Sequence, residues 1–187
     1  MEYFVENSYS GARLRIYREI PISEPKAVVH ITHGMAEHAG RYTWFMQILK
    51  EAGYAVYAHD IRGHGYTYAY NSSKGHFCDK NGLDKILHDL DFSIDFIKKN
   101  HPNIPIYCFG HSLGSILLLR YATSSYHRIN GIACWNSGIE TNLLAIVGRI
   151  ILSIERKLRS PRSKSYFAWK LTSVSYTHLT LPTKLSV

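Results

Sequence analysis

The chain has 187 residues, of which 45% are hydrophobic and 13% aromatic, so it is long enough for one domain with a sizeable core, and its composition excludes a disordered protein. Its formal net charge of +8 is distributed unevenly. Residues 1–112 contain 12 Lys and Arg and 12 Asp and Glu, whereas the residues after Ser112 contain 10 Lys and Arg but only 2 Asp and Glu. Since the first part carries no net charge, the composition does not indicate a nucleic-acid partner.

The N-terminus and the cysteines bear on where the protein resides. Residues 1–11 have neither a basic start nor an apolar core, so no secretory signal is predicted. Cys78, Cys108 and Cys134 form an odd set without metal-ligand spacing, and two of them fall within apolar runs. We expect buried free thiols in a reducing cytoplasm, and neither a metal nor an organic cofactor is implied.

Before residue 100, the spacing of apolar residues predicts five elements. Residues 13–20 alternate polar and apolar as in a half-exposed strand, and 27–31 form a continuous apolar run typical of a strand covered on both faces. The other predicted elements are a helix over 40–52 closed by Gly53, a strand over 54–58 and an amphipathic helix over 83–99.

A further apolar strand over 104–109, a buried helix through 116–121 and a strand over 129–135 complete the regular pattern. Strands that alternate with helices at this spacing predict an α/β fold, with a mostly parallel sheet and helices on both faces. Functional groups of such sheets lie at the carboxyl ends of the strands, which is where His33, Asp60 and Ser112 are placed.

The segment Gly110-His111-Ser112-Leu113-Gly114 joins a predicted strand to a predicted helix. One serine between glycines at such a turn is the arrangement of a nucleophile elbow, because the turn is too tight for side chains beside the serine. The bare pattern G-x-S-x-G is weak, and the flanking strand and helix make it specific. Ser112 is therefore the candidate nucleophile for attack on an ester or amide carbonyl.

A tetrahedral intermediate also needs two backbone N–H donors. The N–H of Leu113, directly after the nucleophile, is one candidate, and the N–H of Met35, in the loop after residues 27–31, is the other. We interpret His33 and His64 as residues that shape loops rather than transfer protons.

Three motifs, HGMAEHAGRY, HDIRGHG and GHSLGS, occur in order and together resemble the monoacylglycerol lipase and lysophospholipase branch of the α/β-hydrolase fold, within the serine aminopeptidase S33 family. The resemblance covers residues 10–140. It implies hydrolysis of lipid esters by Ser112, with the N–H groups of Met35 and Leu113 as oxyanion donors. The family usually has Gly at the position of Ala36 and Ser at that of Thr67, differences that bear on substrate fit more than on the fold.

The acid and the base of a catalytic triad are missing from the expected places. In this fold they follow the nucleophile in the order Ser, Asp or Glu, His. After Ser112 the only carboxylates are Glu140 and Glu155, and the only histidines are His127 and His178. His127 is placed at the end of the sheet remote from the elbow and His178 in a tail outside the fold, so neither partner is assigned.

From residue 137 the sequence resembles the start of the cap that this family inserts over its active site. Residues 142–154 are apolar but too few to span a membrane, so a lipid-facing cap helix is expected, followed by basic residues that are solvated or attract anionic headgroups. From Val174, VSYTHLTLPTK resembles a translated sequencing adapter. We therefore expect a hydrolase core over 1–136, the start of a cap over 137–173, in which the native chain is truncated, and a non-native tail over 174–187.

The first functional hypothesis is a serine hydrolase of monoacylglycerols, lysophospholipids or similar carboxylic esters, with contact to a membrane surface through the cap. Because the acid and base are missing, the 187-residue chain itself is predicted to be inactive or nearly so. An aminopeptidase or an acyltransferase on the same fold, and a non-catalytic binding protein on this scaffold, are the alternatives.

Overall fold

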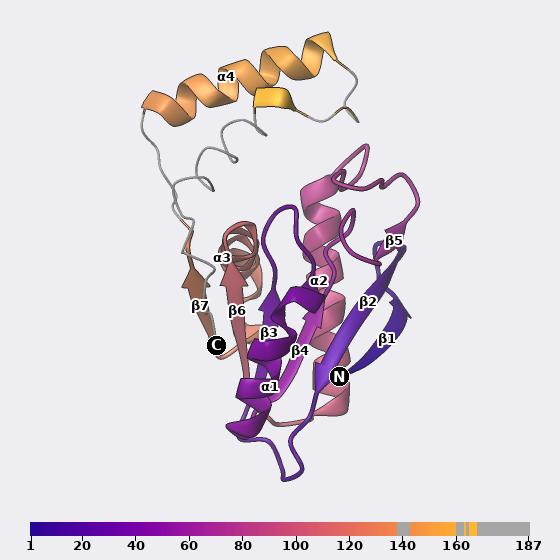
Figure 1. Cartoon of the computed structure of the whole chain (residues 1–187), viewed down its shortest axis with the longest axis vertical. Helices are drawn as coiled ribbons and strands as arrows, with labels where there is room; N and C mark the ends of the chain where they lie inside the picture. Colours follow the sequence, from indigo (N-terminus) through magenta and orange to yellow (C-terminus); the bar gives the residue numbers. More distant parts are fainter. Residues whose placement is uncertain (138–142, 160–162, 164, 168–187) are drawn as a thin grey trace, which may run out of the picture. The chain divides into compact units, whose positions relative to one another are not determined.

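The computed structural model describes residues 1–137, 143–159, 163 and 165–167 (Figure 1). The chain divides into two compact units, Met1–Ile139 and Glu140–Val187. The first unit contains all the residues proposed for the chemistry, and the described part of the second contains one long helix.

Among the described residues, a mixed sheet of seven strands forms the centre of the first unit. Along the sheet the order is β1-β2-β4-β3-β6-β7, and β5 pairs with β2 outside this path. Strands β3, β4, β6 and β7 are parallel, whereas β2 pairs antiparallel with β1, β4 and β5. The strands are β1 (Glu2–Asn7), β2 (Ala12–Glu19), β3 (Val28–Thr32), β4 (Ala55–His59), β5 (Tyr68–Ala69), β6 (Ile106–His111) and β7 (Gly131–Trp135).

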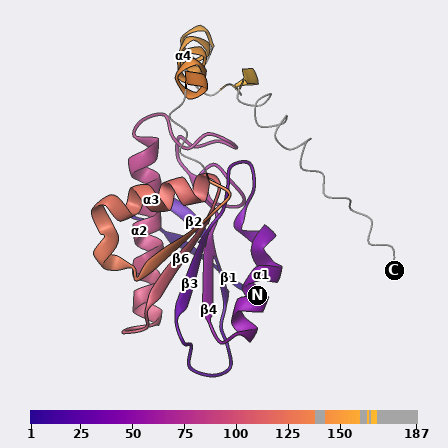
Figure 2. The same ribbon diagram turned by 90° about the vertical axis from the view of Figure 1, so that its left-hand side faces the viewer.

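Helices cover both faces of this sheet, as Figure 2 shows. On one face lies α1 (Thr43–Glu51), which follows the short 3-10 helix η1 (Ala39–Tyr42). On the other face lie α2 (Gly82–Asn100) and α3 (Leu113–Ser125), and η2 (Tyr126–Arg128) leads from α3 to β7. This arrangement confirms the predicted α/β class with a mostly parallel sheet.

The core consists of two main layers of buried side chains, one on each face of the sheet. Met46 of α1 packs in a cluster with Ile31 and Val56. On the opposite face, Leu118 of α3 belongs to a cluster with Tyr57 of β4 and with residues of α2. Because both faces are covered, every residue of β4 is buried, and its first four residues form a continuous apolar run rather than an alternating pattern.

Two strands and two cysteines differ from expectation. Neither β1 nor β5 was predicted, because β1 is half-exposed, β5 has only two residues, and both form through pairing with β2. The expectation of buried thiols holds for Cys108, where burial raises the pKa to about 12. It is wrong for Cys134, which is exposed in β7 at the edge of the described sheet, and Cys78 is only partly buried.

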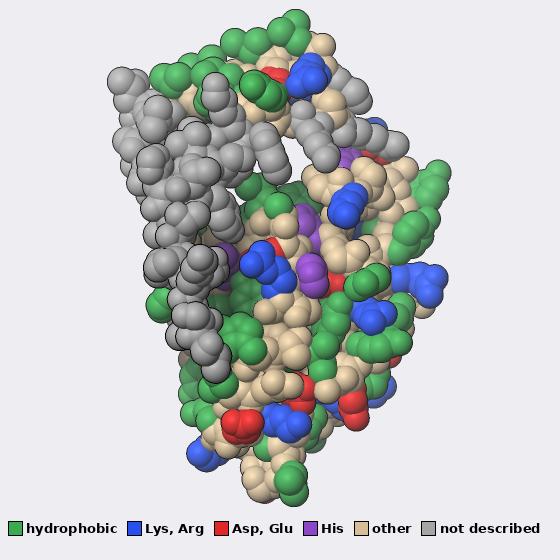
Figure 3. All heavy atoms as spheres, viewed as in Figure 1, with side chains coloured by type: hydrophobic (Ala, Val, Ile, Leu, Met, Phe, Trp, Pro, Cys, Tyr) green, Lys and Arg blue, Asp and Glu red, His purple; other side chains and the backbone are tan. Residues whose placement is uncertain are grey.

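The second unit contains α4 (Leu143–Leu158), where a helix over 142–154 was predicted. Ile146, Ile150 and Ile154, spaced one turn apart, are each about half exposed, and Arg156 and Lys157 lie in the last turn. Figure 3 shows hydrophobic side chains along this helix. No helix of the described ranges is long and apolar enough to cross a membrane. The predicted tail over 174–187 lies outside the described residues, and the role of α4 as a cap stays a prediction.

Candidate active site

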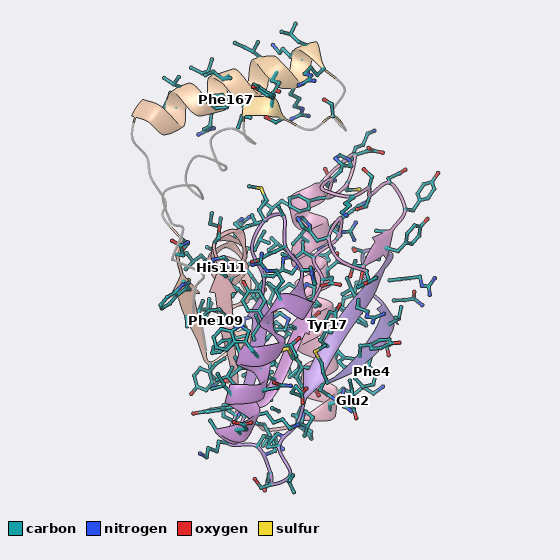
Figure 4. All side chains as sticks on the ribbon, viewed as in Figure 1. Glu2, Phe4, Tyr17, Phe109, His111 and Phe167 are labelled. Atoms are coloured by element: carbon teal, nitrogen blue, oxygen red, sulfur yellow. The ribbon has the colours of Figure 1, made fainter. Side chains whose placement is uncertain are left out.

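Ser112 lies at a sharp junction between β6, whose last residue His111 is labelled in Figure 4, and the first residue of α3. Its φ of 50° and ψ of −114° fall in a region that residues with a Cβ rarely adopt. The Ser112 N–H donates to the carbonyl of Trp135 in β7 (2.9 Å), and the Ser112 carbonyl accepts from the Ser115 N–H (3.0 Å). Hydrogen bonds to β7 and to the first turn of α3 therefore hold Ser112 in a strained backbone conformation, and this residue is partly exposed.

The two glycines of the elbow are required by close backbone contacts. A Cβ added to Gly110 would lie 2.6 Å from the backbone N and Cα of Ser115. A Cβ added to Gly114 would lie 2.0 Å from the carbonyl oxygen of Thr32 and 2.7 Å from that of His33. These separations are far inside van der Waals contact, so α3 can begin against β3 and β6 only if both positions lack a side chain.

The loop after β3 carries the second candidate oxyanion donor and lies directly beside the elbow. A Cβ added to Gly34 would lie 3.3 Å from the carbonyl oxygen of His111. Within the described residues, neither the Met35 N–H nor the Leu113 N–H donates a hydrogen bond. Ala36 has φ 60°, a left-handed conformation that Gly adopts without strain. The loop and the start of α3 thus bring two unused N–H donors to the same end of the sheet.

The histidines of the two flanking loops hold backbone groups. His33 is fully buried, and its Nδ1 donates to the Gly34 carbonyl (2.7 Å) while its Nε2 accepts from the Ile61 N–H (2.9 Å). His64 Nε2 accepts from the Ala36 N–H (3.3 Å). Burial lowers the pKa of His33 to about 3 and also lowers the pKa of His64. Both rings are therefore neutral near pH 7 and shape the loops, in agreement with the sequence interpretation.

Two carboxylates that sequence reasoning did not single out as site residues organise the same loops. Asp60 is fully buried and accepts from the N–H groups of Ala39 and Tyr66, both at 2.8 Å. It also accepts from the Tyr17 hydroxyl (3.2 Å), whose pKa burial and this carboxylate raise to about 12. The sequence placed Asp60 at the end of a strand. Its role as the hydrogen-bond acceptor for donors from three separate segments depends on the fold.

Glu37 is the second such carboxylate, and its side chain is 8% exposed. Its Oε1 accepts from the Gly34 N–H, from Tyr42 Oη (2.8 Å) and from His111 Nδ1 (2.8 Å). Burial by itself would raise the pKa of Glu37, but the hydrogen bonds from His111, Tyr42 and Gly34 bring this pKa below its usual value. The sequence signal was the Glu inside HGMAEHAGRY, which carried no assigned role.

Within the described residues, no imidazole or carboxylate is hydrogen-bonded to the Ser112 hydroxyl. His127 lies in η2 before the first residue of β7, and β7 runs parallel to β6, so it is at the opposite end of the sheet from Ser112. Glu155 accepts from Ser165 Oγ (2.6 Å) and from the Tyr166 N–H within the second unit. Glu140 and His178 lie outside the described residues.

The histidines and carboxylates of this region do not form a metal site. Across the described ranges, no group of three or more His, Cys, Asp or Glu side chains could hold a metal ion. The strained elbow and the adjacent loop have the geometry that nucleophilic attack by a serine with backbone stabilisation of an oxyanion would require.

Comparison with known proteins places this geometry in a family. The model of the family described as "Serine aminopeptidase, S33" (Hydrolase_4) matches residues 23–180. The monoglyceride lipase of Rattus norvegicus is 31% identical over 111 residues, which cover 59% of this chain and 35% of that protein. The monoacylglycerol lipase of Mycolicibacterium smegmatis is 34% identical over 119 residues, which cover 62% of this chain and 40% of that protein.

Solved structures show the same fold. A thermostable carboxyl esterase from Bacillus coagulans, in complex with glycerol, superposes with a TM-score of 0.75 at 22% identity, over 98% of this chain and 59% of the esterase. The architecture is thus that of an α/β-hydrolase. The aligned segment spans well under half the length of the two lipases named above.

Proposed function

Because the chain belongs to the serine aminopeptidase S33 family of α/β-hydrolases, we propose that the protein is a serine hydrolase that cleaves carboxylic esters of lipids, a monoacylglycerol or a lysophospholipid, through an acyl-enzyme. The single observation that carries the proposal is the strained backbone of Ser112 between β6 and α3, beside a loop whose Met35 N–H donates no hydrogen bond to any described residue. The lipases to which the chain is similar support the choice of lipid esters over other carbonyl substrates.

In the proposed reaction, Ser112 Oγ attacks the ester carbonyl carbon, and the negative charge that develops on the carbonyl oxygen is stabilised by the N–H groups of Met35 and Leu113. A base accepts the serine proton and passes it to the departing alcohol as the carbon–oxygen bond breaks. Water then cleaves the acyl-enzyme, and the serine recovers its proton. Since no described residue offers that base, we propose that the 187-residue chain reacts slowly and that the protein from the complete gene reacts fast.

A panel of substrates tests the proposal. The protein expressed from the complete gene should hydrolyse p-nitrophenyl esters and monoacylglycerols, the Ser112→Ala variant should not, and the surface variant Ser124→Ala on α3 should match the wild type. An activity retained by Ser112→Ala contradicts the assigned nucleophile.

An aminopeptidase is the second candidate, because the matched family carries that description. A protein that prefers amino-acid p-nitroanilides to p-nitrophenyl esters supports the aminopeptidase and overturns the esterase. This comparison is informative because both reactions use the same elbow and differ in the groups that bind the substrate.

We further propose that α4 contacts an anionic membrane surface. Its exposed isoleucines at one-turn spacing and the basic residues Arg149, Arg156 and Lys157 combine an apolar side with positive charge. Sedimentation with vesicles checks this: binding to phosphatidylcholine vesicles that contain phosphatidylserine should exceed binding to pure phosphatidylcholine and should weaken at high salt. Equal binding to both vesicle types contradicts it.

A further inference from the structure

The Glu37 carboxylate joins the loop after β3 to the nucleophile elbow. It hydrogen-bonds on one side to its own loop, through the Gly34 N–H, and on the other side to His111, the residue directly before Ser112. These partners are 74 residues apart in the sequence. Tyr42 donates to the same oxygen, and Arg41 lies 3.6 Å from the other one, so the carboxylate is held from several sides.

The absence of a side chain at Gly34 makes this contact possible. A Cβ at that position would lie 2.7 Å from Glu37 Oε1 and 3.0 Å from His111 Nδ1. Glycine therefore leaves the space that the carboxylate and the imidazole occupy. Because Glu37 is nearly buried, its hydrogen bonds to His111 and Tyr42 are screened little by water.

The backbone on both sides of this contact is strained, since Ala36 and Ser112 both have positive φ. Strained conformations persist only where their surroundings hold them. Without the carboxylate, the loop keeps the hydrogen bond from Ala36 to His64, but no other described side chain of residues 33–38 hydrogen-bonds to the elbow.

We propose that Glu37 is a positioning residue, which holds the Met35 N–H at the correct separation from the Leu113 N–H so that both donors reach one oxyanion. The inference rests on the proposed function, because it assigns Glu37 a part in that same site. The carboxylate acts through the loop and touches no reacting atom. A displacement of about 1 Å at such donors can reduce the rate on the order of a hundredfold, so the effect is measurable.

The experiment compares Glu37→Ala with the matched control Glu19→Ala. Glu19 is also a buried carboxylate with two charged partners, Lys50 (2.9 Å) and the amino terminus (2.8 Å), but it lies in β2 and does not contact the elbow. In the protein expressed from the complete gene, the reaction of Ser112 with a fluorophosphonate is resolved into a binding constant KI and a rate constant kinact. A third variant, Glu37→Gln, keeps one acceptor oxygen.

The positioning role predicts that Glu37→Ala lowers kinact about ten- to hundredfold with KI unchanged, because oxyanion donors act in the transition state. Glu37→Gln should recover part of the loss, and Glu19→Ala should leave kinact unchanged even where it lowers stability. Equal kinact values in wild type and Glu37→Ala, or the same loss in both alanine variants, overturn the inference.

Amide hydrogen exchange tests the positioning role of Glu37 independently of the proposed function. If the wild type does not react with the probe, the proposed function fails, and exchange at the Ala36 N–H, whose acceptor His64 is unaltered, decides the inference alone. Glu37→Ala should speed this exchange at least about tenfold, as expected for a loop that opens locally, and Glu19→Ala should not. Unchanged exchange in Glu37→Ala overturns it.

Discussion

Replacement of Gly114 by alanine is the sharpest perturbation of the elbow. The added Cβ would lie 2.0 Å from the carbonyl oxygen of Thr32 and 2.7 Å from that of His33, and both obstacles are backbone atoms. Relief requires the first turn of α3 to move away from the end of β3 by about 1 Å, which is a case of overpacking that costs roughly 1–3 kcal/mol. Since no flexible side chain can give way, we expect a loss of about 3 kcal/mol in the free energy of unfolding.

Urea unfolding followed by circular dichroism measures this loss. With a slope of about 1–3 kcal/mol per M, the midpoint should fall by about 1–3 M. The control is Gly82→Ala, at the first residue of α2, where the added Cβ would meet only the Cβ of Phe77 at 3.4 Å. This variant should unfold within about 0.5 kcal/mol of the wild type. A midpoint for Gly114→Ala equal to that of the control would refute the close contact between α3 and β3.

Three further outcomes follow from buried charge, buried imidazoles and backbone strain. Asp89→Ala should cost about 3–5 kcal/mol, because the guanidinium of Arg62, 1% exposed and 2.7 Å away, then lacks its charged partner. Glu2→Ala, which breaks the more exposed pair with Arg18, should cost under about 1 kcal/mol. Equal losses of the two variants in urea unfolding contradict this. Burial lowers the pKa of His33 to about 3, so below pH 6.5 the unfolded chain binds more protons than the folded one. The free energy of unfolding should therefore fall on acidification from pH 6.5 toward 3, by about 1.4 kcal/mol per pH unit for this histidine. If His33→Gln leaves the slope of this free energy against pH unchanged, the assignment is contradicted. Ala36→Gly should raise the midpoint of thermal unfolding by about 2–4 °C, because glycine removes backbone strain of about 1 kcal/mol at φ 60°. A lowered midpoint contradicts this prediction.

The elbow could be predicted because its causes are local. The glycines at 110 and 114, the apolar strand before them and the apolar helix after them lie within one short segment, and steric limits alone require this combination. The central strands were predicted for the same reason, since strands covered on both faces leave continuous apolar runs. The half-exposed β1 and the two-residue β5 carry no such local pattern.

The contacts between loops could not be predicted, because they depend on the register of distant strands. Thr32 pairs with Gly110 in the parallel ladder of β3 and β6, and this register brings the loop after β3 beside the elbow. Only then do Glu37 and His111 meet. Asp60 likewise accepts hydrogen bonds from an N–H group of η1, an N–H group of the loop before β5 and a hydroxyl of β2, and no spacing in the sequence indicates these contacts.

The most direct test of the central claim is to locate the residue that a fluorophosphonate modifies. In the protein expressed from the complete gene, tandem mass spectrometry should find the label on Ser112, and Ser112→Ala should remain unlabelled while it unfolds like the wild type. The 187-residue chain should label at the same residue much more slowly. A label on another residue, or no label on the folded protein from the complete gene, would contradict the account.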